Sequence, residues 1–300
     1  MLNKLTEDYY CPAPESDTVF MNACAKPFHS LFDCVWGSEQ IDVDDEIAEL
    51  LSTIIPFGAF KSKKLPIGVK QGPGIYQHMQ DNALAAEYKP NGEKLSDVFF
   101  DDTHTADYTA EQHVESLTHV LKAVRKYDIQ YRLTKCEFFK PEILLLGFIC
   151  SVNGRRPDPK KVEQLKAWPE YREKEDIASH LAFCNYLREF FGPDYNDQTK
   201  PFWLYLKKGA DFKGGWPTDE VAHAARAWLI NATLTNCILA VSRPWQSGRP
   251  SEVYSDASDE GWCVCLCQRG RPGAFVCKSF VEEAARGFSF EREYYAFKEG

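Results

Sequence analysis

The segment from residue 98 to residue 103 carries the most informative change from apolar to polar positions in the chain. Val98, Phe99 and Phe100 form a short apolar run, and the adjacent acids Asp101 and Asp102 follow it. The pattern predicts a strand that delivers two carboxylates to its tip, and oxygen ligands on a rigid strand end suit hard cations such as Mg²⁺. A strand followed by an ordinary polar turn would give the same pattern, because Asp is common in turns.

A third acid is expected from elsewhere in the chain. Successive strand side chains point to opposite faces, so Asp101 and Asp102 cannot reach one ion equally well. Residues 28–33 read as a short strand that ends in Asp33. Asp33 is therefore the candidate third carboxylate.

The clearest helical pattern covers residues 111–126. Val114, Leu117, Leu121 and Val124 recur there at helical spacing. We expect this helix to lay that apolar face across the sheet that carries the acids.

The same rules place other elements along the chain. Glycine and proline punctuation over residues 57–77 predicts tight turns before a helix that starts near Ile75. Short strands are predicted at residues 41–43, 131–133 and 143–149, and helices through Lys166, over 176–191 and over 219–232. Residues 244–250 read as a linker, and strands at 253–258 and 262–268 and a helix from residue 288 follow it.

Composition changes this picture little. The chain has 300 residues, of which 44% are hydrophobic and 26% charged, as expected for a globular protein of about two domains. The net charge of −9 argues mildly against a nucleic-acid partner, but basic residues cluster at 61–64, 155–161 and 207–208. Each cluster could equally be a solvated face.

The sequence favours an intracellular protein with no membrane partner. The first residues lack the apolar stretch of a signal peptide, and no run is long enough to span a bilayer. The eleven cysteines are then expected to be reduced thiols. No CxxC pair occurs, and Cys263, Cys265 and Cys267 alternate at strand period, which favours one packed face over a zinc site.

A second strand that delivers an acid lies near the end of the chain. Residues 253–258 place Asp256 on this strand, and Glu293 on the following helix could face it across a site. The alternative for Asp256 is an exposed acid at a strand end.

In this order, the segments resemble the reverse transcriptase and RNase H segment of the pol polyprotein of gypsy-type LTR retrotransposons and retroviruses. The matching residues are Ser30-Leu31-Phe32-Asp33, Leu65-Pro66-Ile67-Gly68-Val69, Gly72-Pro73-Gly74-Ile75-Tyr76-Gln77, Phe99-Phe100-Asp101-Asp102, Lys135-Cys136-Glu137-Phe138-Phe139, Leu145-Leu146-Gly147-Phe148-Ile149, Arg156-Pro157-Asp158-Pro159-Lys160-Lys161-Val162, Trp168-Pro169, Asp256-Ala257-Ser258 and Phe290-Glu291-Arg292-Glu293.

The resemblance implies an α+β fold in four parts. Residues 1–154 would be the palm, with the fingers mostly missing, and residues 155–210 a helical thumb. Residues 211–249 would form the connection, and residues 250–300 the incomplete N-terminal part of an RNase H-like α/β domain. The chain would thus be a segment truncated at both ends.

The implied activity is RNA-directed DNA polymerisation. Asp33, Asp101 and Asp102 would hold two Mg²⁺ ions, which activate the primer hydroxyl and neutralise the triphosphate. The implied partners are an RNA template, a DNA primer, the RNA–DNA hybrid and dNTPs. Asp256 and Glu293 would begin an RNase H site that cannot hold metal, because two of its four acids are missing.

The resemblance also assigns two binding regions. Ser38, Ile67, Gly68 and Gln77 would lie near the incoming nucleotide, and Leu146, Gly147 and Phe148 would lie near the primer.

Three positions depart from the family pattern. Ser38 stands where the family carries a bulky aromatic residue that excludes a ribose 2′-hydroxyl, Ile67 stands where an aromatic residue or glutamine is usual, and Phe99 stands where many members carry tyrosine. The missing fingers and the missing RNase H acids favour an alternative function, that of a catalytically inactive retrotransposon remnant that at most binds nucleic acid.

Overall fold

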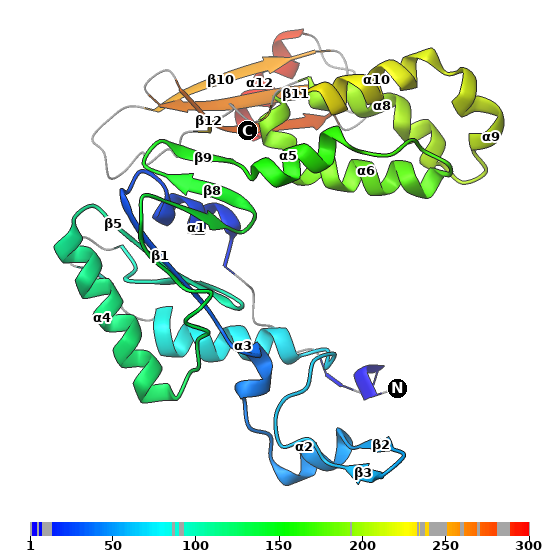
Figure 1. Ribbon diagram of the computed structural model, residues 1–300. Coiled ribbons are helices and arrows are strands. Elements are labelled where there is room, and N and C mark those ends of the chain that lie inside the picture. The colour runs from blue at the N-terminus through cyan, green and yellow to red at the C-terminus, as the bar shows by residue number, and fades with distance from the viewer. Residues whose placement is uncertain are drawn as a thin grey trace. The chain divides into compact units, whose positions relative to one another are not determined.

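The computed structural model describes residues 2–4, 6–7, 14–85, 88–89, 93–192, 194–232, 234, 238–239, 251–258, 261–268, 271–280 and 289–299 (Figure 1). The chain divides into two compact units. The first comprises residues 1–146 and 150–152, and the second comprises residues 147–149 and 153–300.

The first unit is built around a four-stranded antiparallel sheet. Its order is β4-β5-β1-β6, with bounds Asp97–Phe99, Asp102–Asp107, Phe28–Asp33 and Glu137–Lys140 respectively. The predicted strand at residues 28–33 is confirmed to the residue. Because β1 lies between two partners, the strand that ends in Asp33 is held from both sides.

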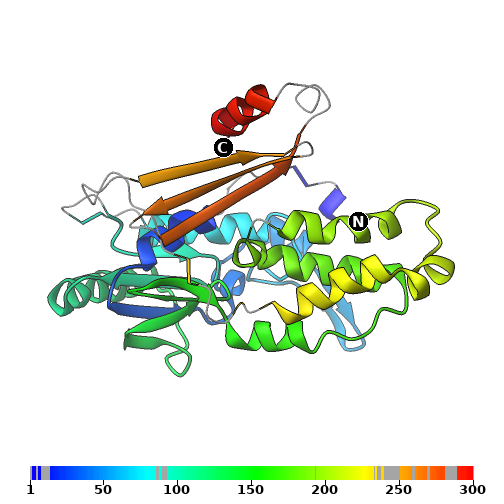
Figure 2. The same ribbon diagram turned by 90° about the horizontal axis from the view of Figure 1, so that it is seen from above.

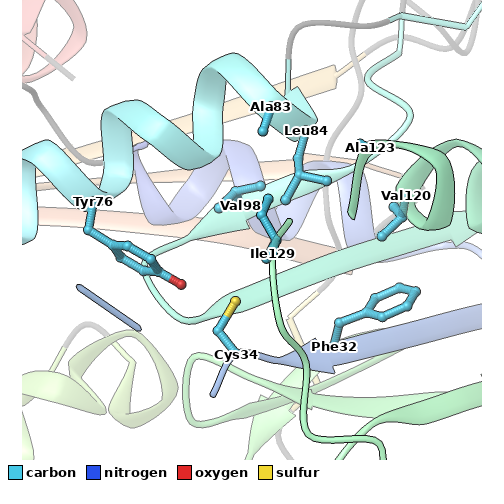
Figure 3. Packing of buried hydrophobic residues seen from close by; sticks show 9 residues of the cluster. All are labelled: Phe32, Cys34, Tyr76, Ala83, Leu84, Val98, Val120, Ala123 and Ile129. Carbon is cyan, nitrogen blue, oxygen red and sulfur yellow. The ribbon is translucent and has the colours of Figure 1, made fainter. Parts of the chain in front are cut away.

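The longer helices of the first unit are α1 (Ser16–Ala23), α2 (Asp45–Leu50), α3 (Gly72–Gln80) and α4 (Ala110–Tyr127). Residues of α3 and α4 pack with the sheet in a hydrophobic core. Figure 3 shows core side chains converging from β1, α3, β4 and α4; the buried residues are Phe32, Cys34, Tyr76, Ala83, Leu84, Val98, Val120, Ala123 and Ile129. The acid-bearing strand ends thus rest on a packed base.

Helix α4 buries only part of the face that its apolar residues predict. Leu117 and Val124 pack partly buried against the core, but Val114 and Leu121 are each 53% exposed, and the polar His113 and Ser116 are fully buried. His113 Nδ1 lies 2.7 Å from Asp107 Oδ2, and Ser116 donates to Asp107 Oδ1 at 3.1 Å. The predicted helix is confirmed. Its buried face is shifted towards His113 and Ser116 by their contacts with the buried Asp107, and hydrophobic periodicity does not reveal such contacts.

The rest of the first unit consists of short elements. They are η1 (Leu2–Lys4), η2 (Gly37–Gln40), the π-helical turn η3 (Asp81–Ala85) and the hairpin β2 (Thr53–Ile55) and β3 (Gly58–Phe60). The strands predicted at residues 41–43 and 131–133 are wrong. Only isolated bridges occur there, between Asp42 and Lys64 and between Cys34 and Tyr131.

A three-stranded sheet of order β7-β8-β9 follows α4 and β6 along the chain. Its strands are Glu142–Leu145, Phe148–Ser151 and Gly154–Pro157. The single strand predicted at residues 143–149 is divided by a turn at Leu146 and Gly147, whose φ angles are 48° and 77°. A positive φ ends a strand, and glycine adopts it readily.

The second unit is largely helical in its first part. Its helices are α5 (Pro159–Lys166), α6 (Lys174–Tyr186), α7 (Arg188–Phe191), α8 (Tyr195–Leu206), α9 (Phe212–Gly215), η4 (Trp216–Thr218) and α10 (Glu220–Asn231). The predicted helix at 176–191 is two helices, and the one at 219–232 is confirmed as α10. Helix α8 escaped prediction because Pro201 lies inside it.

The last described part is a three-stranded sheet with a helix on one face (Figure 2). Its elements are β10 (Ser251–Ala257), β11 (Gly261–Gln268), β12 (Arg271–Ser279) and α12 (Ser289–Glu299). Trp262 and Val264 of β11 pack against Ala296 of α12. The predicted linker at 244–250 lies outside the described residues.

Seven of the described cysteines are free thiols, as predicted: Cys24, Cys34, Cys136, Cys150, Cys184, Cys265 and Cys267. Cys263 is disulfide-bonded, which corrects the expectation of reduced thiols. No helix in the described ranges combines the length and the apolar character needed to cross a bilayer.

Candidate active site

Two of the three predicted acids end neighbouring strands. Asp33, the last residue of β1, is the register partner of Asp102, the first residue of β5. Asp101 precedes it in the turn from β4, where Phe100 has a φ of 50°, and the Cys34 N–H donates to the Asp101 carbonyl at 3.1 Å. All three acids therefore lie at the same end of the neighbouring strands β1 and β5, as the sequence predicts.

Burial and mutual repulsion raise the pKa values of two of these acids. Burial first, and then the charges of Asp33 and Asp101, raise the pKa of Asp102 to about 6. Burial and the charge of Asp33 also raise the pKa of Asp101. Lys135 Nζ, 3.4 Å from Asp33 Oδ2, is the cation that opposes this repulsion at Asp102. Raised carboxylate pKa values in an open cleft are typical of functional sites.

We expect Asp102→Asn to stabilise the metal-free protein at neutral pH. The folded-state pKa of about 6 lies above the ordinary value of 3.8, so wild-type stability should fall as the pH rises from about 4 to 6. The variant has no carboxyl group to ionise at this position. Above pH 7 its free energy of unfolding should therefore exceed that of the wild type by on the order of 1–2 kcal/mol, after allowance for solvent screening. Urea unfolding in EDTA at pH 4 and pH 8 measures it; a gain of equal size at both pH values would contradict the assignment.

The Asp101 carboxylate packs against the backbone of Gly37. Its Cγ lies 3.4 Å from the point that a Cβ on Gly37 would occupy, and its Oδ1 is closer still. Within the described ranges, no three or more His, Cys, Asp or Glu side chains are grouped so that they could hold a metal ion. The donor chemistry suits Mg²⁺, but the three acids do not fit the ion in this arrangement.

A cavity of about 490 Å³ opens beside Asp101. Its lining includes Ser38, Ile67 and Gly68, three of the four residues predicted to bind the nucleotide. Ile67 is 83% exposed and Trp36, which also lines the cavity, is 71% exposed. The structure thus brings together one catalytic and three binding candidates.

Gln77, the fourth predicted nucleotide residue, lies elsewhere. Its side chain is fully buried, accepts from the Phe100 N–H at 2.8 Å and donates to the Val98 carbonyl at 3.2 Å. Gln77 therefore supports the β4–β5 turn from beneath, and with it the backbone of Asp101.

Sequence reasoning missed a second glutamine, Gln40. Its side chain accepts from the Gln130 N–H at 2.8 Å and donates to the carbonyl oxygens of Gln130 and Val35. Gln40 thereby fixes the turn between β1 and η2 that forms one cavity wall. No periodic signal marks it, because its partner is 90 residues away.

The predicted primer residues form the turn between β7 and β8. In the second unit, Phe148 stacks on Tyr186 and Phe190 of the α6–α7 region with ring centroids 4.8 and 5.4 Å away. A Cβ on Gly147 would overlap the Tyr186 hydroxyl and lie 3.1 Å from Lys161 Cε. Glycine is thus required for α6 to close on this turn.

The two predicted RNase H acids lie on β10 and α12. Asp256 is exposed and pairs in register with Cys263, and Glu293 is half-buried. As at the first site, they belong to no group of three or more possible metal ligands among the described residues.

Comparison with known proteins identifies the first unit. Residues 17–150 match the family model of reverse transcriptase (RNA-dependent DNA polymerase). This segment is a reverse transcriptase domain. The match includes Asp33, Asp101, Asp102 and the cavity beside them, so the resemblance noted from the sequence is confirmed.

The reverse transcriptase segment has relatives among retroelement polyproteins. The chain is 28% identical over 297 residues to the Pol polyprotein of Drosophila melanogaster transposon 412, covering 97% of this chain and 23% of that protein. It is 25% identical to that of transposon gypsy, covering 98% and 28%, and 26% identical to the enzymatic polyprotein of figwort mosaic virus, covering 91% and 40%. The chain thus spans about a quarter of the length of the transposon polyproteins.

Solved structures confirm the reverse transcriptase palm and thumb fold. The foamy viral protease-reverse transcriptase in complex with dsDNA matches with a TM-score of 0.82 at 18% identity, covering 99% of this chain and 60% of that one. Its complex with RNA/DNA hybrid matches with a TM-score of 0.80, covering 99% and 39%. The predicted α+β class is confirmed.

Proposed function

We propose that the chain is the central part of an RNA-directed DNA polymerase, which adds deoxynucleotides to a primer by nucleotidyl transfer. The observation that carries this proposal is the pairing of Asp33 with Asp102 across β1 and β5, next to a cavity lined by Ser38, Ile67 and Gly68. The family match and the retroelement relatives support it.

Under this proposal each part of the chain has a role. Residues 1–154 are the palm, 155–210 the thumb, 211–249 the connection and 250–300 the start of an RNase H domain. The partners are an RNA template, a DNA primer, their hybrid and dNTPs, in line with the nucleic acids bound by the foamy viral enzyme. Leu146, Gly147 and Phe148 would lie along the primer.

The reverse transcriptase family generally uses Mg²⁺, and we propose Asp33, Asp101 and Asp102 as its ligands here. Two of these acids already lie together, and the raised pKa values of Asp101 and Asp102 give a cation an electrostatic reason to bind. When bound, the ion would supply charge neutralisation at the phosphates. Asp256 and Glu293 stay candidates for a second metal site.

Primer extension tests the function. The chain, expressed within a polyprotein segment as long as those of its relatives, should extend a DNA primer on an RNA template with Mg²⁺ and dNTPs. Extension that depends on the template supports the polymerase. Binding of primer–template without extension would instead support the inactive remnant that only binds nucleic acid.

Ser38 leads us to expect weak discrimination against ribonucleotides. It lines the cavity in the place where the family carries an aromatic ring, and a ring there would exclude a 2′-hydroxyl by bulk. Serine leaves that space open, so Ser38→Tyr should improve deoxyribonucleotide selectivity about 100-fold or more, at ~1.4 kcal/mol for each tenfold.

The measurement is the ratio of kcat/KM for a dNTP and the matching rNTP. Ile67→Phe, which adds a ring at another position of the same cavity, is the control for bulk alone. Equal rejection of ribonucleotides by the wild type and by the Ser38→Tyr variant would remove Ser38 from the sugar position; filling of the gap by Trp36 would explain that result.

A further inference from the structure

We propose that Ser30, His113 and Asp107 form a buried latch that holds a bulge in strand β6, and that this bulge keeps β6 from pairing with a second copy of the chain. The latch would act whether or not the chain polymerises DNA, because none of its members lines the cavity beside Asp101.

Strand β6 is irregular where it passes Ser30. The register between β1 and β6 shifts there by one residue, so Phe138 and Phe139 both lie opposite that single serine. Phe139 has a φ of 51°, a left-handed conformation that is unfavourable for a residue with a Cβ. Two residues opposite one make a β-bulge, and other contacts must offset its cost.

The packing of the two phenylalanines shows the same bulge. Adjacent residues of a regular strand point to opposite faces. Here the Phe138 ring meets the Phe32 ring edge-on, with centroids 5.3 Å apart. The Phe139 ring meets the Phe28 ring in the same way at 6.3 Å. Phe28 and Phe32 are four residues apart on β1 and share a face, so both phenylalanines of β6 pack on that face.

The latch supplies the hydrogen-bond partner that the bulge needs. The Phe139 N–H donates to the Ser30 hydroxyl at 3.1 Å. That hydroxyl lies 2.7 Å from His113 Nε2, and His113 Nδ1 lies 2.7 Å from Asp107 Oδ2. With the ring proton on Nδ1 facing the carboxylate, Nε2 accepts from the Ser30 hydroxyl, and every donor in the series has an acceptor. The backbone of the bulge is thereby tied to α4 and β5.

Serine, histidine and aspartate in this order also form the triad of many hydrolases. Burial argues against that use here, because Ser30 and His113 are 0% exposed and Asp107 is 1% exposed. The Ser30 hydroxyl is bonded on both sides, whereas a nucleophile needs room beside it for a substrate. The three side chains are therefore positioning residues for β6.

Strand β6 needs this control because it ends its sheet. The order β4-β5-β1-β6 leaves one edge of β6 without a neighbour among the described strands. All four of its residues are exposed, Phe138 by 40% and Phe139 by 44%. An exposed apolar edge strand is a template for another strand, and a bulge turns such an edge out of the pairing geometry. A second copy presents the same edge, so two regular β6 strands could pair about a two-fold axis.

Ser30→Ala removes the acceptor at the bulge, and Ser116→Ala is its matched control. Ser116 is also fully buried, and its hydroxyl donates to the same Asp107 carboxylate at 3.1 Å, but that bond leaves the Phe139 N–H untouched. In native-state amide exchange followed by NMR, the Phe139 amide should exchange about tenfold or more faster in Ser30→Ala than in Ser116→Ala, relative to the β5 amides of each variant. Equal relative exchange in the two variants would remove Ser30 from the bulge.

Self-association gives the second readout. Sedimentation velocity should show dimers and larger species of Ser30→Ala at concentrations where Ser116→Ala sediments like the wild type. Phe139→Lys added to Ser30→Ala should abolish these species, because a charge on an edge strand opposes pairing. Faster Phe139 exchange without added association, or association that Phe139→Lys leaves unchanged, would overturn the role of the bulge.

A second pair of variants covers the case in which Ser30→Ala does not fold. Ser30→Thr and Ser30→Val match in shape and differ in the hydroxyl. Faster exchange of the Phe139 amide and self-association are then expected of Ser30→Val alone, and the same behaviour in both variants would contradict the latch.

Discussion

In the longer polyprotein segment used for primer extension, Asp101→Asn should reduce extension about a thousandfold or more. The amide keeps the size of the side chain and removes its charge at the point where the cavity meets the strand ends. Loss of one well-placed electrostatic contact at a reacting centre costs several kcal/mol, and each ~1.4 kcal/mol is tenfold in rate. The measurement is single-turnover extension on a primed RNA template with Mg²⁺.

The controls separate charge at the site from charge elsewhere. Asp45→Asn removes an exposed acid of α2 in the same unit and should leave extension unchanged. Asp102→Asn should be milder than Asp101→Asn, because Asp101 lines the cavity and Asp102 is not among its lining residues. Undiminished extension by Asp101→Asn would remove Asp101 from the site.

Asp107→Asn should destabilise the first unit by about 3–5 kcal/mol. The buried Asp107 carboxylate receives the Lys89 ammonium, His113 Nδ1 at 2.7 Å and the Ser116 hydroxyl at 3.1 Å. Burial acts to raise its pKa, but the hydrogen bonds from His113 and Lys89 prevail and hold the pKa below its usual value. The substitution leaves a buried lysine without its counter-charge.

Urea unfolding at pH 7 measures this loss, with Asp42→Asn as the matched control. Asp42 also pairs with a lysine, Lys64 at 2.8 Å, but its side chain is 82% exposed, so its loss should cost less than about 1 kcal/mol. Because a lowered pKa stabilises only the ionised form, the wild-type advantage should disappear as the pH falls through the folded pKa of Asp107. Equal losses for the two variants would contradict the role of burial.

The parts of the fold that were predictable are those where local pattern and tertiary contact agree. Strand β1 is a short segment that ends in an acid, and it lies between two partners that hold its full predicted length in the sheet. Helix α4 was placed correctly along the chain, but only part of its predicted face is buried, because the burial of His113 depends on Asp107, which no window of hydrophobicity reports. The α+β class, taken from the family resemblance, is confirmed.

The candidate site divides in the same way. Asp33, Asp101 and Asp102 follow from strand-end patterns, and their neighbourhood follows from the sheet register. The roles of Gly37 and Gln40 were out of reach, because a missing Cβ and an amide bonded to a residue 90 positions away leave no local trace. Whether Asp256 and Glu293 act as an RNase H site stays a prediction.

The position of β1 in its sheet also sets an order of events during synthesis. Its partners, β5 and β6, begin at Asp102 and Glu137, and the contact of Ser30 with His113 closes a separation of 83 residues. For contacts this distant in sequence, the chain loses the entropy of loop closure before the contacts can stabilise it, and this slows folding. The strand that carries the first catalytic candidate therefore leaves the ribosome early and waits, unpaired, until more than 70 further residues have followed it.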